Sequence, residues 1–439
     1  MRSISAISVL ALPFLASAWL PGEHKQIFSQ DGIDLFNRSS LYKHGLTKRT
    51  PDLPTIDNQV KVRGVNLGSY FVVENWMAST VFSGFKCTKT SEFDCVSSLN
   101  NQSTANSDFQ SHWQSWIKAD DFKKMASLGL NTVRIPVGYW FLESIVDSSE
   151  HFPQGGEKYL DQAVQWAKDA GLYVIIELHG APGAQATDAF TGQLNPSPGF
   201  FDTYNYDRAC QWLEWITNKV HSDPSYSTVG MIGLVNEPVR IGDSRYPNAK
   251  SQTDSMRKDY YPKAWTTIRN KEDSLNVAKD QQVHIQMMAK AWGSGDPNQY
   301  LPDQTFWHAA YDDHVYVKYS SAKVSHQGYL DFSCGETLSG NSPVIVGEWS
   351  LSVNSGVEHD NDWDPKNAAN QDFYKKWFAA QVMAYEKGQS IGWTFWSWST
   401  SGLSDPRWDY QKGVDAGIIL SNIDDAYTIG ACSQSTSKA

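Results

Sequence analysis

The sequence predicts an α/β fold, a (β/α)8 TIM barrel with long loops over the carboxyl-terminal ends of its strands. Short runs of β-branched residues alternate with amphipathic stretches from residue 60 onward. The stretches between successive runs are long enough for the crossovers that parallel strands need. A doubly wound open sheet is the alternative, but no Gly-x-Gly-x-x-Gly follows the first run to favour it.

Eight runs have the β-branched composition that is typical of buried strands. They are Lys61–Asn66, Thr132–Pro136, Tyr173–Leu178, Met231–Val235, His284–Met287, His314–Val317, Val344–Val346 and Ile391–Phe395. Between them, apolar residues recur with helical spacing, as at Leu160, Ala163, Val164 and Ala167. We expect helices over Asp120–Leu128, Tyr159–Ala170, Tyr206–Val220, Tyr260–Lys271 and Asp372–Glu386. Three long segments are expected to be loops that wall a cleft, namely Ser69–Trp113, Gly180–Asn205 and Val239–Asp259.

Residues 1–18 have the features of a secretory signal peptide: Arg2, an apolar stretch, and Ala16-Ser17-Ala18 ahead of Trp19. No later apolar run reaches membrane length, so we expect an exported chain with no membrane partner. Residues 19–58 are polar and aperiodic, and we interpret them as an N-terminal arm or pro-segment. Residues 59–439 form the barrel domain in this interpretation.

Export makes disulfides available to the five cysteines. The four loop cysteines allow three pairings, of which we favour Cys87 with Cys95 and Cys334 with Cys432. Cys210 lies in an apolar helical pattern and is expected to be a buried thiol. Asn37 and Asn101 begin glycosylation sequons, which suit an exported chain.

The composition indicates which classes of ligand or partner the chain could bind. The formal net charge of −11 argues against nucleic acid. The 18 tryptophans are more than core packing usually needs, and flat indole rings suit sugar surfaces. The histidines lack a His-x-x-x-His spacing or a companion cysteine cluster, so neither a metal nor a cofactor is expected.

Two of the strand-like stretches deliver a glutamate to a strand end. Gly230–Pro238 stops at Asn236-Glu237-Pro238, because proline cannot continue the hydrogen bonding of a sheet. Pro343–Ser350 carries Glu348 in the same context. Barrel active sites gather at the carboxyl ends of the strands, and two carboxyl groups at one edge are what glycoside hydrolysis requires. The alternative for Asn236 is a helix cap.

Further polar or amphipathic residues fall at the same strand ends. They are Asn66, Arg134, His179, His314, Tyr316 and Trp396. Singly, each has a structural explanation, such as a buried ion pair for Arg134 or a satisfied core histidine for His179. Together they favour a site, because each buried polar group must find a partner.

Two other carboxylates and several aromatic rings have either structural or substrate-binding roles in this interpretation. Glu177 shares a strand face with His179, and we expect it to pair with a neighbouring cation. Glu74 lies in a Val-Val-Glu-Asn-Trp stretch. Four aromatic residues are candidates for sugar stacking or, equally, for core packing: Tyr70, Trp76, Trp140 and Trp292.

Seven motifs in order carry a resemblance to a known family. They are Arg63–Gly68, Val133–Trp140, Leu178–Gly183, Val235–Pro238, Asp313–Tyr316, Val346–Ser350 and Gly392–Trp396. Together they resemble glycoside hydrolase family 5 of clan A, from about residue 60 to the C-terminus. Within that family the chain is most similar to the secreted fungal endo-β-1,6-glucanases, a likeness carried by Asp94–Val96, His151–Gly156, Ala291–Pro297 and Tyr374–Phe378.

The resemblance implies a retaining double displacement with Glu237 as acid/base and Glu348 as nucleophile. Carboxyl groups in that mechanism are about 5–5.5 Å apart. The matching positions imply substrate-binding or supporting roles for Arg134, His179, Asn236, His314, Tyr316, Trp396 and Glu74. Of these, Arg134 would keep Glu348 ionised, and His314 would help to orient it.

The implied substrate is the β-1,6-linked glucan of fungal cell walls, cut by a secreted monomer in the extracellular space. An exo-β-1,3-glucanase or a glucan transglycosylase is the alternative within enzymes. A non-catalytic wall-binding protein is the alternative from another class. The choice of the 1,6 linkage follows from likeness alone.

Overall fold

The computed structural model describes residues 61–302, 308–338, 340–388 and 390–432. The predicted signal peptide, the N-terminal arm and the sequon at Asn37 lie outside the described residues. Those three interpretations therefore stay predictions.

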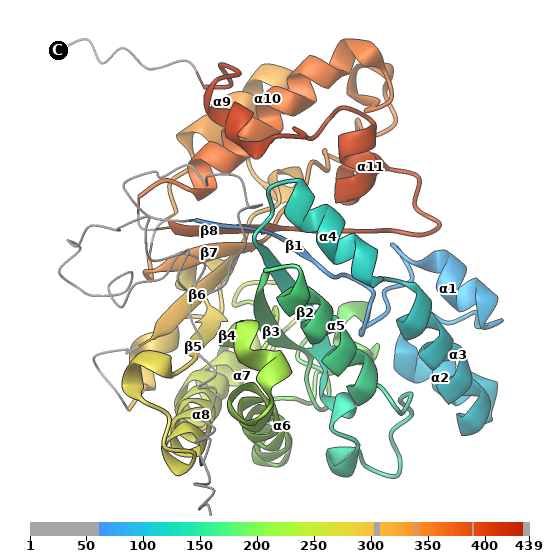
Figure 1. Ribbon diagram of the computed structural model, residues 1–439, viewed down its shortest axis with the longest axis vertical. Helices are drawn as coiled ribbons and strands as arrows, with labels where there is room; N and C mark the ends of the chain where they lie inside the picture. Colours follow the sequence, from blue (N-terminus) through green and yellow to red (C-terminus); the bar gives the residue numbers. More distant parts are fainter. Residues whose placement is uncertain (1–60, 303–307, 339, 389, 433–439) are drawn as a thin grey trace, which may run out of the picture.

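Eight parallel strands close into a barrel in chain order, with β8 hydrogen-bonded to β1 (Figure 1). The strands are β1 Val62–Asn66, β2 Thr132–Gly138, β3 Tyr173–Gly180, β4 Val229–Gly233, β5 His284–Met288, β6 Ala309–His314, β7 Val344–Glu348 and β8 Ser390–Phe395. The predicted (β/α)8 class is confirmed.

The predicted strand at His314–Val317 is wrong. The sixth strand, β6, is Ala309–His314, so it ends where the predicted strand begins. Its interior carries Asp312, which is 2% exposed. Two successive aspartates read as a loop in the sequence, whereas the following Val-Tyr-Val run has the composition of a strand. Pairing of Asp312 with a distant arginine makes its burial possible, and local patterns do not contain that information.

Helices surround the barrel, and each of the five predicted helices is found with shifted ends. The helices are α1 Ser79–Gly84, α2 Glu92–Leu99, α3 Gln102–Ser115, α4 Ala119–Ser127, α5 Glu157–Asp169, α6 Thr203–Ser222, α7 Ala249–Ser255, α8 Tyr261–Ser274, α9 His326–Gly335, α10 Ala368–Tyr385 and α11 Tyr410–Asp415. In Figure 1, α1 to α3 lie together beside the barrel.

Two of the predicted loops contain helices, which corrects the expectation for Ser69–Trp113 and Val239–Asp259. Helices α1, α2 and α3 occupy much of the first segment, and α7 lies in the second. The side chains of Ser91 and Asn101 accept hydrogen bonds from backbone N–H groups at the starts of α2 and α3. These capping residues were the sequence signal from which α2 and α3 could have been predicted. The sequence of α3 is too polar to show an apolar stripe.

Apolar side chains fill one end of the barrel interior and polar side chains fill the other. The apolar cluster comprises Val62, Tyr173, Ile175, Met231, Ala310, Ile345 and Ile391. Side chains alternate along a strand, so Glu177 and His179 follow Ile175 on the inner face of β3. Gly233 and Gly347 leave room for this polar layer: a β-carbon at either would collide with Glu177 or Asp312. The polar groups therefore gather toward the carboxyl ends of the strands.

Both favoured disulfides are present. Cys87 pairs with Cys95, and Cys334 on α9 pairs with Cys432. Cys210 is a buried free thiol, as expected. Of the helices in the described ranges, none is both long and apolar enough to cross a membrane.

Removing the Cys334–Cys432 bridge is expected to destabilise the fold more than removing the other bridge. Its cysteines are 98 residues apart, against 8 for Cys87–Cys95. Closing a longer loop removes more entropy from the unfolded chain, so Cys432→Ser should lower the free energy of unfolding by about 2–5 kcal/mol. Chemical denaturation measures it, with Cys95→Ser as the comparison. Equal losses from the two variants would contradict the expectation.

Candidate active site

A cavity of about 780 Å³ opens at the carboxyl ends of the strands. Its lining includes eight residues that were predicted for the site: Glu74, His179, Asn236, Glu237, His314, Tyr316, Glu348 and Trp396. Arg134 and Asn66, which were also predicted for the site, are completely buried. A cavity of this size is typical of small-molecule sites.

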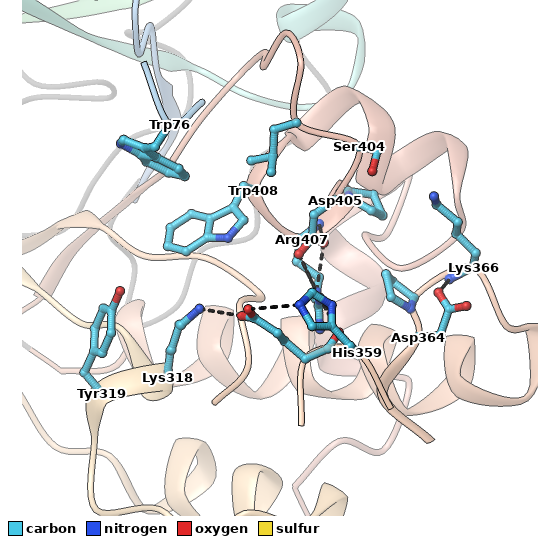
Figure 2. A pocket seen from close by; sticks show the side chains of 14 residues that line it. Trp76, Lys318, Tyr319, His359, Asp364, Lys366, Ser404, Asp405, Arg407 and Trp408 are labelled. Carbon is cyan, nitrogen blue, oxygen red and sulfur yellow. Dashed lines mark hydrogen bonds and ion pairs between the residues drawn. The ribbon is translucent and has the colours of Figure 1, made fainter. Parts of the chain in front are cut away.

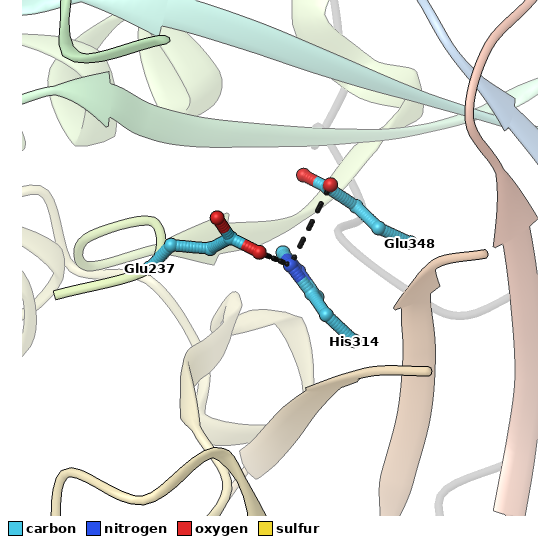
Figure 3. Close-up of side chains that lie close together, drawn as sticks. All are labelled: Glu237, His314 and Glu348. Carbon is cyan, nitrogen blue, oxygen red and sulfur yellow. Dashed lines mark hydrogen bonds and ion pairs between the residues drawn. The ribbon is translucent and has the colours of Figure 1, made fainter. Parts of the chain in front are cut away.

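The two predicted catalytic glutamates approach each other from strands that are not neighbours in the barrel. Glu348 is the last residue of β7, and Glu237 follows β4 in a left-handed backbone conformation with φ of 40°. A carboxylate oxygen of each, together with a ring nitrogen of His314, lies within 4.8 Å of the others. Figure 3 shows His314 between the two carboxyl groups. Donors this close would also suit a metal ion, so the expectation of a metal-free site stays a prediction.

His314 bridges the glutamates and contacts Glu237 more closely than Glu348. Its Nδ1 is 2.7 Å from Oε1 of Glu237 and 3.6 Å from Oε2 of Glu348. Burial favours the neutral ring, but the carboxylates of Glu348, Asp312 and Glu237 outweigh burial and raise the pKa of His314 well above its usual value. The resulting positive charge reduces the repulsion between the two glutamates.

Glu348 is held by a phenol and a guanidinium. The Tyr316 hydroxyl donates a hydrogen bond to Oε2 of Glu348 at 2.8 Å, and Nη1 of Arg134 donates to Oε1 at 3.1 Å. Burial nevertheless raises the pKa of Glu348, and the nearby Glu237 adds to the rise, while His314, Arg134 and His179 oppose it. Arg134 therefore limits the rise in the pKa of Glu348 but does not cancel it.

Arg134 also organises the layer beneath the cavity. Its Nη1 donates to Oδ1 of Asn66 at 2.8 Å, and its Nη2 donates to Oε2 of Glu177 at 2.6 Å and to Oδ1 of Asn236 at 2.9 Å. Nη2 also lies 3.3 Å from Oδ2 of Asp312. The expected pairing of Glu177 with a cation is confirmed. The amide oxygen of Asn236 accepts from Arg134, and among the described residues its amide nitrogen donates to no group, so it is available at the cavity that Asn236 lines.

His179 and Trp396 form one wall of the cavity. Their rings are parallel within 9°, with centroids 5.6 Å apart. Nδ1 of His179 hydrogen-bonds to Oε1 of Glu177, and among the described residues its buried Nε2 has no hydrogen-bond partner. A donor or acceptor presented in this way suits a sugar hydroxyl.

Glu74 contributes a second group without a partner. Oε2 of Glu74 accepts a hydrogen bond from the indole of Trp76 at 2.8 Å, whereas its buried Oε1 has no partner in the described ranges. Burial raises the pKa of Glu74 to about 7, assisted by Glu348 and Glu237 and opposed by His179 and Trp76.

Substituting Glu74 with glutamine is expected to stabilise the protein increasingly as pH rises. A carboxyl whose pKa is raised from 4.5 to about 7 binds its proton more tightly in the folded state. Wild-type stability therefore falls between these two pH values, by about 3 kcal/mol for this group. The advantage of Glu74→Gln over wild type should grow across that window in denaturation curves. Glu214→Gln, on the exposed face of α6, is the control, and a constant difference for Glu74→Gln would contradict the expectation.

The four aromatic candidates divide between core and cavity. Tyr70 and Trp140 are essentially buried, and Trp140 stacks on Phe152 with ring centroids 4.2 Å apart. Trp76 and Trp292 line the cavity instead. The indole of Trp292 donates to the carbonyl of Pro238 at 2.9 Å, which fixes the ring beside Glu237.

Sequence reasoning missed Asp312 and Trp408. Asp312 contacts both Arg134 and His314, and it was overlooked because the sixth strand was placed too late in the chain. Trp408 lines the cavity and contacts the ring of Tyr316, with centroids 5.6 Å apart. It lies in a polar loop after β8, where no periodic pattern marks it.

A closed α/β barrel with two carboxyl groups this close at its strand ends is the arrangement of the retaining glycoside hydrolases. Comparison with known proteins agrees with that class. Residues 97–402 match the family described as cellulase (glycosyl hydrolase family 5). The chain therefore belongs to glycoside hydrolase family 5.

Curated relatives match nearly the whole chain. It is 50% identical to glucan endo-1,6-beta-glucosidase B of Emericella nidulans, over 95% of this chain and 97% of the relative. It is 48% identical to a probable glucan endo-1,6-beta-glucosidase B of Neosartorya fischeri, over 98% and 100%. Identity to glucan 1,3-beta-glucosidase 2 of Wickerhamomyces anomalus is 29%, over 85% and 90%.

Solved structures show the same fold. The rutinosidase from Aspergillus niger superposes with a TM-score of 0.64 at 19% identity, covering 82% of this chain and 97% of that one. At this identity the likeness supports the barrel architecture alone.

Proposed function

We propose that this protein is a retaining endo-β-1,6-glucanase that hydrolyses the β-1,6-linked glucan of fungal cell walls. The observation that carries the chemistry is the approach of Glu237 and Glu348 to within 4.8 Å, the spacing of a double displacement rather than of an inverting site. The likeness to the endo-1,6-beta-glucosidases, at about half of all positions, supports the linkage.

In the first step, Glu348 attacks the anomeric carbon and Glu237 protonates the departing glycosidic oxygen, which gives a glycosyl-enzyme and a shortened glucan. In the second step, Glu237 takes a proton from water, and the water oxygen displaces Glu348. Tyr316 and Arg134 hold the nucleophile in position through their hydrogen bonds. The amide nitrogen of Asn236 suits a hydrogen bond to the sugar 2-hydroxyl.

Trp396 provides the surface under the sugar at the point of cleavage, and His179 and Glu74 supply hydrogen bonds to its hydroxyls. The unpartnered Nε2 of His179 and Oε1 of Glu74 support these roles. A buried polar group without a partner costs free energy, and a bound sugar would recover it.

Product analysis on glucans of defined linkage tests the proposal. Wild-type protein should cut pustulan, a β-1,6-glucan, into mixed oligosaccharides and should cut laminarin, a β-1,3-glucan, poorly. Glu348→Gln keeps the shape of the nucleophile but removes its charge, and it should be inactive on both. Glucose as the sole early product would indicate exo action, and products longer than the substrate would indicate transfer. Intact pustulan, with wild type and variant indistinguishable, would refute the enzyme assignment.

We further propose that the protein acts outside the cell. The signal-like residues 1–18 and the two disulfides support export. The N-terminal sequence of protein collected from culture medium would locate the processing site, and a chain retained inside the cell and beginning at Met1 would contradict export.

A further inference from the structure

A second cavity of about 680 Å³ adjoins the candidate active site (Figure 2). Three aromatic residues, Trp76, Tyr319 and Trp408, line both cavities. The remaining walls come from the segments after β6, β7 and β8, including Lys318, Glu358 and residues 403–407. The two cavities therefore form one trough that passes over these three rings.

The end of the second cavity next to the active site is aromatic. Trp76 is 45% exposed and Tyr319 is 74% exposed, although large aromatic side chains are highly buried on average. Trp76 and Trp408 meet edge to face with centroids 5.0 Å apart. The indole of Trp76 is fixed by its hydrogen bond to Glu74. Flat rings held in place in this way present apolar surface to the C–H faces of a sugar at little entropic cost.

The same cavity also carries charged side chains, which are held in place by ion pairs with one another. Nζ of Lys318 is 2.7 Å from Oε2 of Glu358, and Arg407 is 2.7 Å from Asp405. Nη2 of Arg407 also donates to the backbone carbonyl of Glu358 at 3.0 Å, which ties the segment after β7 to the segment after β8. Figure 2 shows Lys318 beside Tyr319, and Asp405 and Arg407 beyond Trp408 as seen from Trp76. Polar groups set beside an apolar floor are what a polyhydroxylated ligand requires.

The position of the second cavity gives the direction of the bound chain. The leaving oxygen must lie beside Glu237, after β4, so the released part of the substrate extends over the β4–β5 side, where Trp292 lies. In a closed barrel of eight strands, β7 and β8 lie across from β3 and β4. The second cavity is built mainly on segments after β7 and β8, with Trp76 from the segment after β1. It therefore lies away from the β4–β5 side and receives the other end of the sugar chain.

We propose that the second cavity binds two or more glucosyl units on the non-reducing side of the scissile bond, with Trp408 and Tyr319 as the principal contacts. This inference rests on the proposed function and adds to it the residues that select an internal position in the glucan. A chain held on both sides of the catalytic pair is cut within its length, whereas a site closed on this side would release single sugars.

Nitrophenyl glycosides of increasing length test the inference, because the leaving group stays constant. For wild-type protein, kcat/KM should rise from nitrophenyl β-glucoside to nitrophenyl β-gentiotrioside, which has three β-1,6-linked units. In Trp408→Ala and in Tyr319→Ala this rise should shrink by about tenfold, the loss expected for one aromatic anchor. Tyr319 is largely exposed, so its variant keeps the core intact even if Trp408→Ala disturbs the neighbouring Tyr316. Tyr300→Ala is the matched control, because the ring of Tyr300 is exposed but lines neither cavity.

The outcomes separate this inference from the proposed function. Equal losses on short and long glycosides, or no rise with length in wild type, would overturn the inference while leaving the hydrolase intact. If wild type cleaves none of the substrates, the proposed function fails. Whether the second cavity binds glucan is then measured by calorimetry of gentiotetraose binding to Glu348→Gln. Weaker binding after Tyr319→Ala in that background supports the second cavity, and unchanged or absent binding overturns it.

Discussion

Replacing Glu237 with alanine is expected to lower kcat on pustulan by about 10²–10⁴-fold and to make activity on activated substrates dependent on added azide. A sugar leaving group needs the proton that Glu237 supplies, whereas nitrophenolate leaves without one. The glycosyl-enzyme on Glu348 then accumulates, because no base activates water. Azide needs no base, and it can enter the space left by the missing carboxylate.

The configuration of the azide product decides between mechanisms. Attack on the glycosyl-enzyme from the face opposite Glu348 gives a β-glucosyl azide, which NMR identifies. An α product would contradict retention, and turnover that azide does not change would remove Glu237 from the role of acid/base. Glu214→Ala deletes an exposed carboxylate of α6 and should behave as wild type, with or without azide.

Replacing Arg134 with methionine is expected to damage both stability and the ionisation of Glu348. The guanidinium is fully buried and contacts the carboxylates of Glu177, Asp312 and Glu348. Removing one partner of a buried ion pair leaves uncompensated charge, which costs about 3–5 kcal/mol. Arg134 also lowers the pKa of Glu348, so its loss should raise that pKa further. Since the nucleophile must be ionised, the acidic limb of the kcat/KM profile should move to higher pH.

Arg63→Met is a matched control for this experiment. Arg63 is also buried and pairs with Glu386 at 2.7 Å, but it lies near the start of β1, away from the cavity. Its loss should cost comparable stability, measured by denaturation, and leave the pH profile in place. A profile for Arg134→Met that overlays that of wild type would show that Arg134 has no effect on the nucleophile.

The glutamates could be found from sequence because each sits beside a recognisable strand. The Val344–Val346 run leads directly to Glu348, and the Met231–Val235 run lies just before Glu237. Their convergence follows from the barrel itself, which brings the carboxyl ends of all its strands to one mouth. Hydrophobic pattern and fold class together therefore predict where the two proposed reacting groups lie.

The residues that support the glutamates were harder to predict from sequence, because their positions depend on partners that are distant in the chain. The burial of Asp312 inside the barrel depends on its contacts with Arg134, which is 178 residues away, and with His314. Trp408 acquires its place in the trough from contacts with Tyr316 and Trp76. Periodicity describes neighbours in sequence, so it contains no signal for either residue.

The pairing of β1 with β8 has a consequence for biogenesis. The first and last strands are separated by more than three hundred residues of chain, yet each is the other's neighbour. A nascent polypeptide cannot close the cylinder until residue 395 has emerged from the ribosome, and until then two strand edges remain open to other chains. Trp396 comes even later, so a chain cut short before that point should be inactive and prone to aggregate.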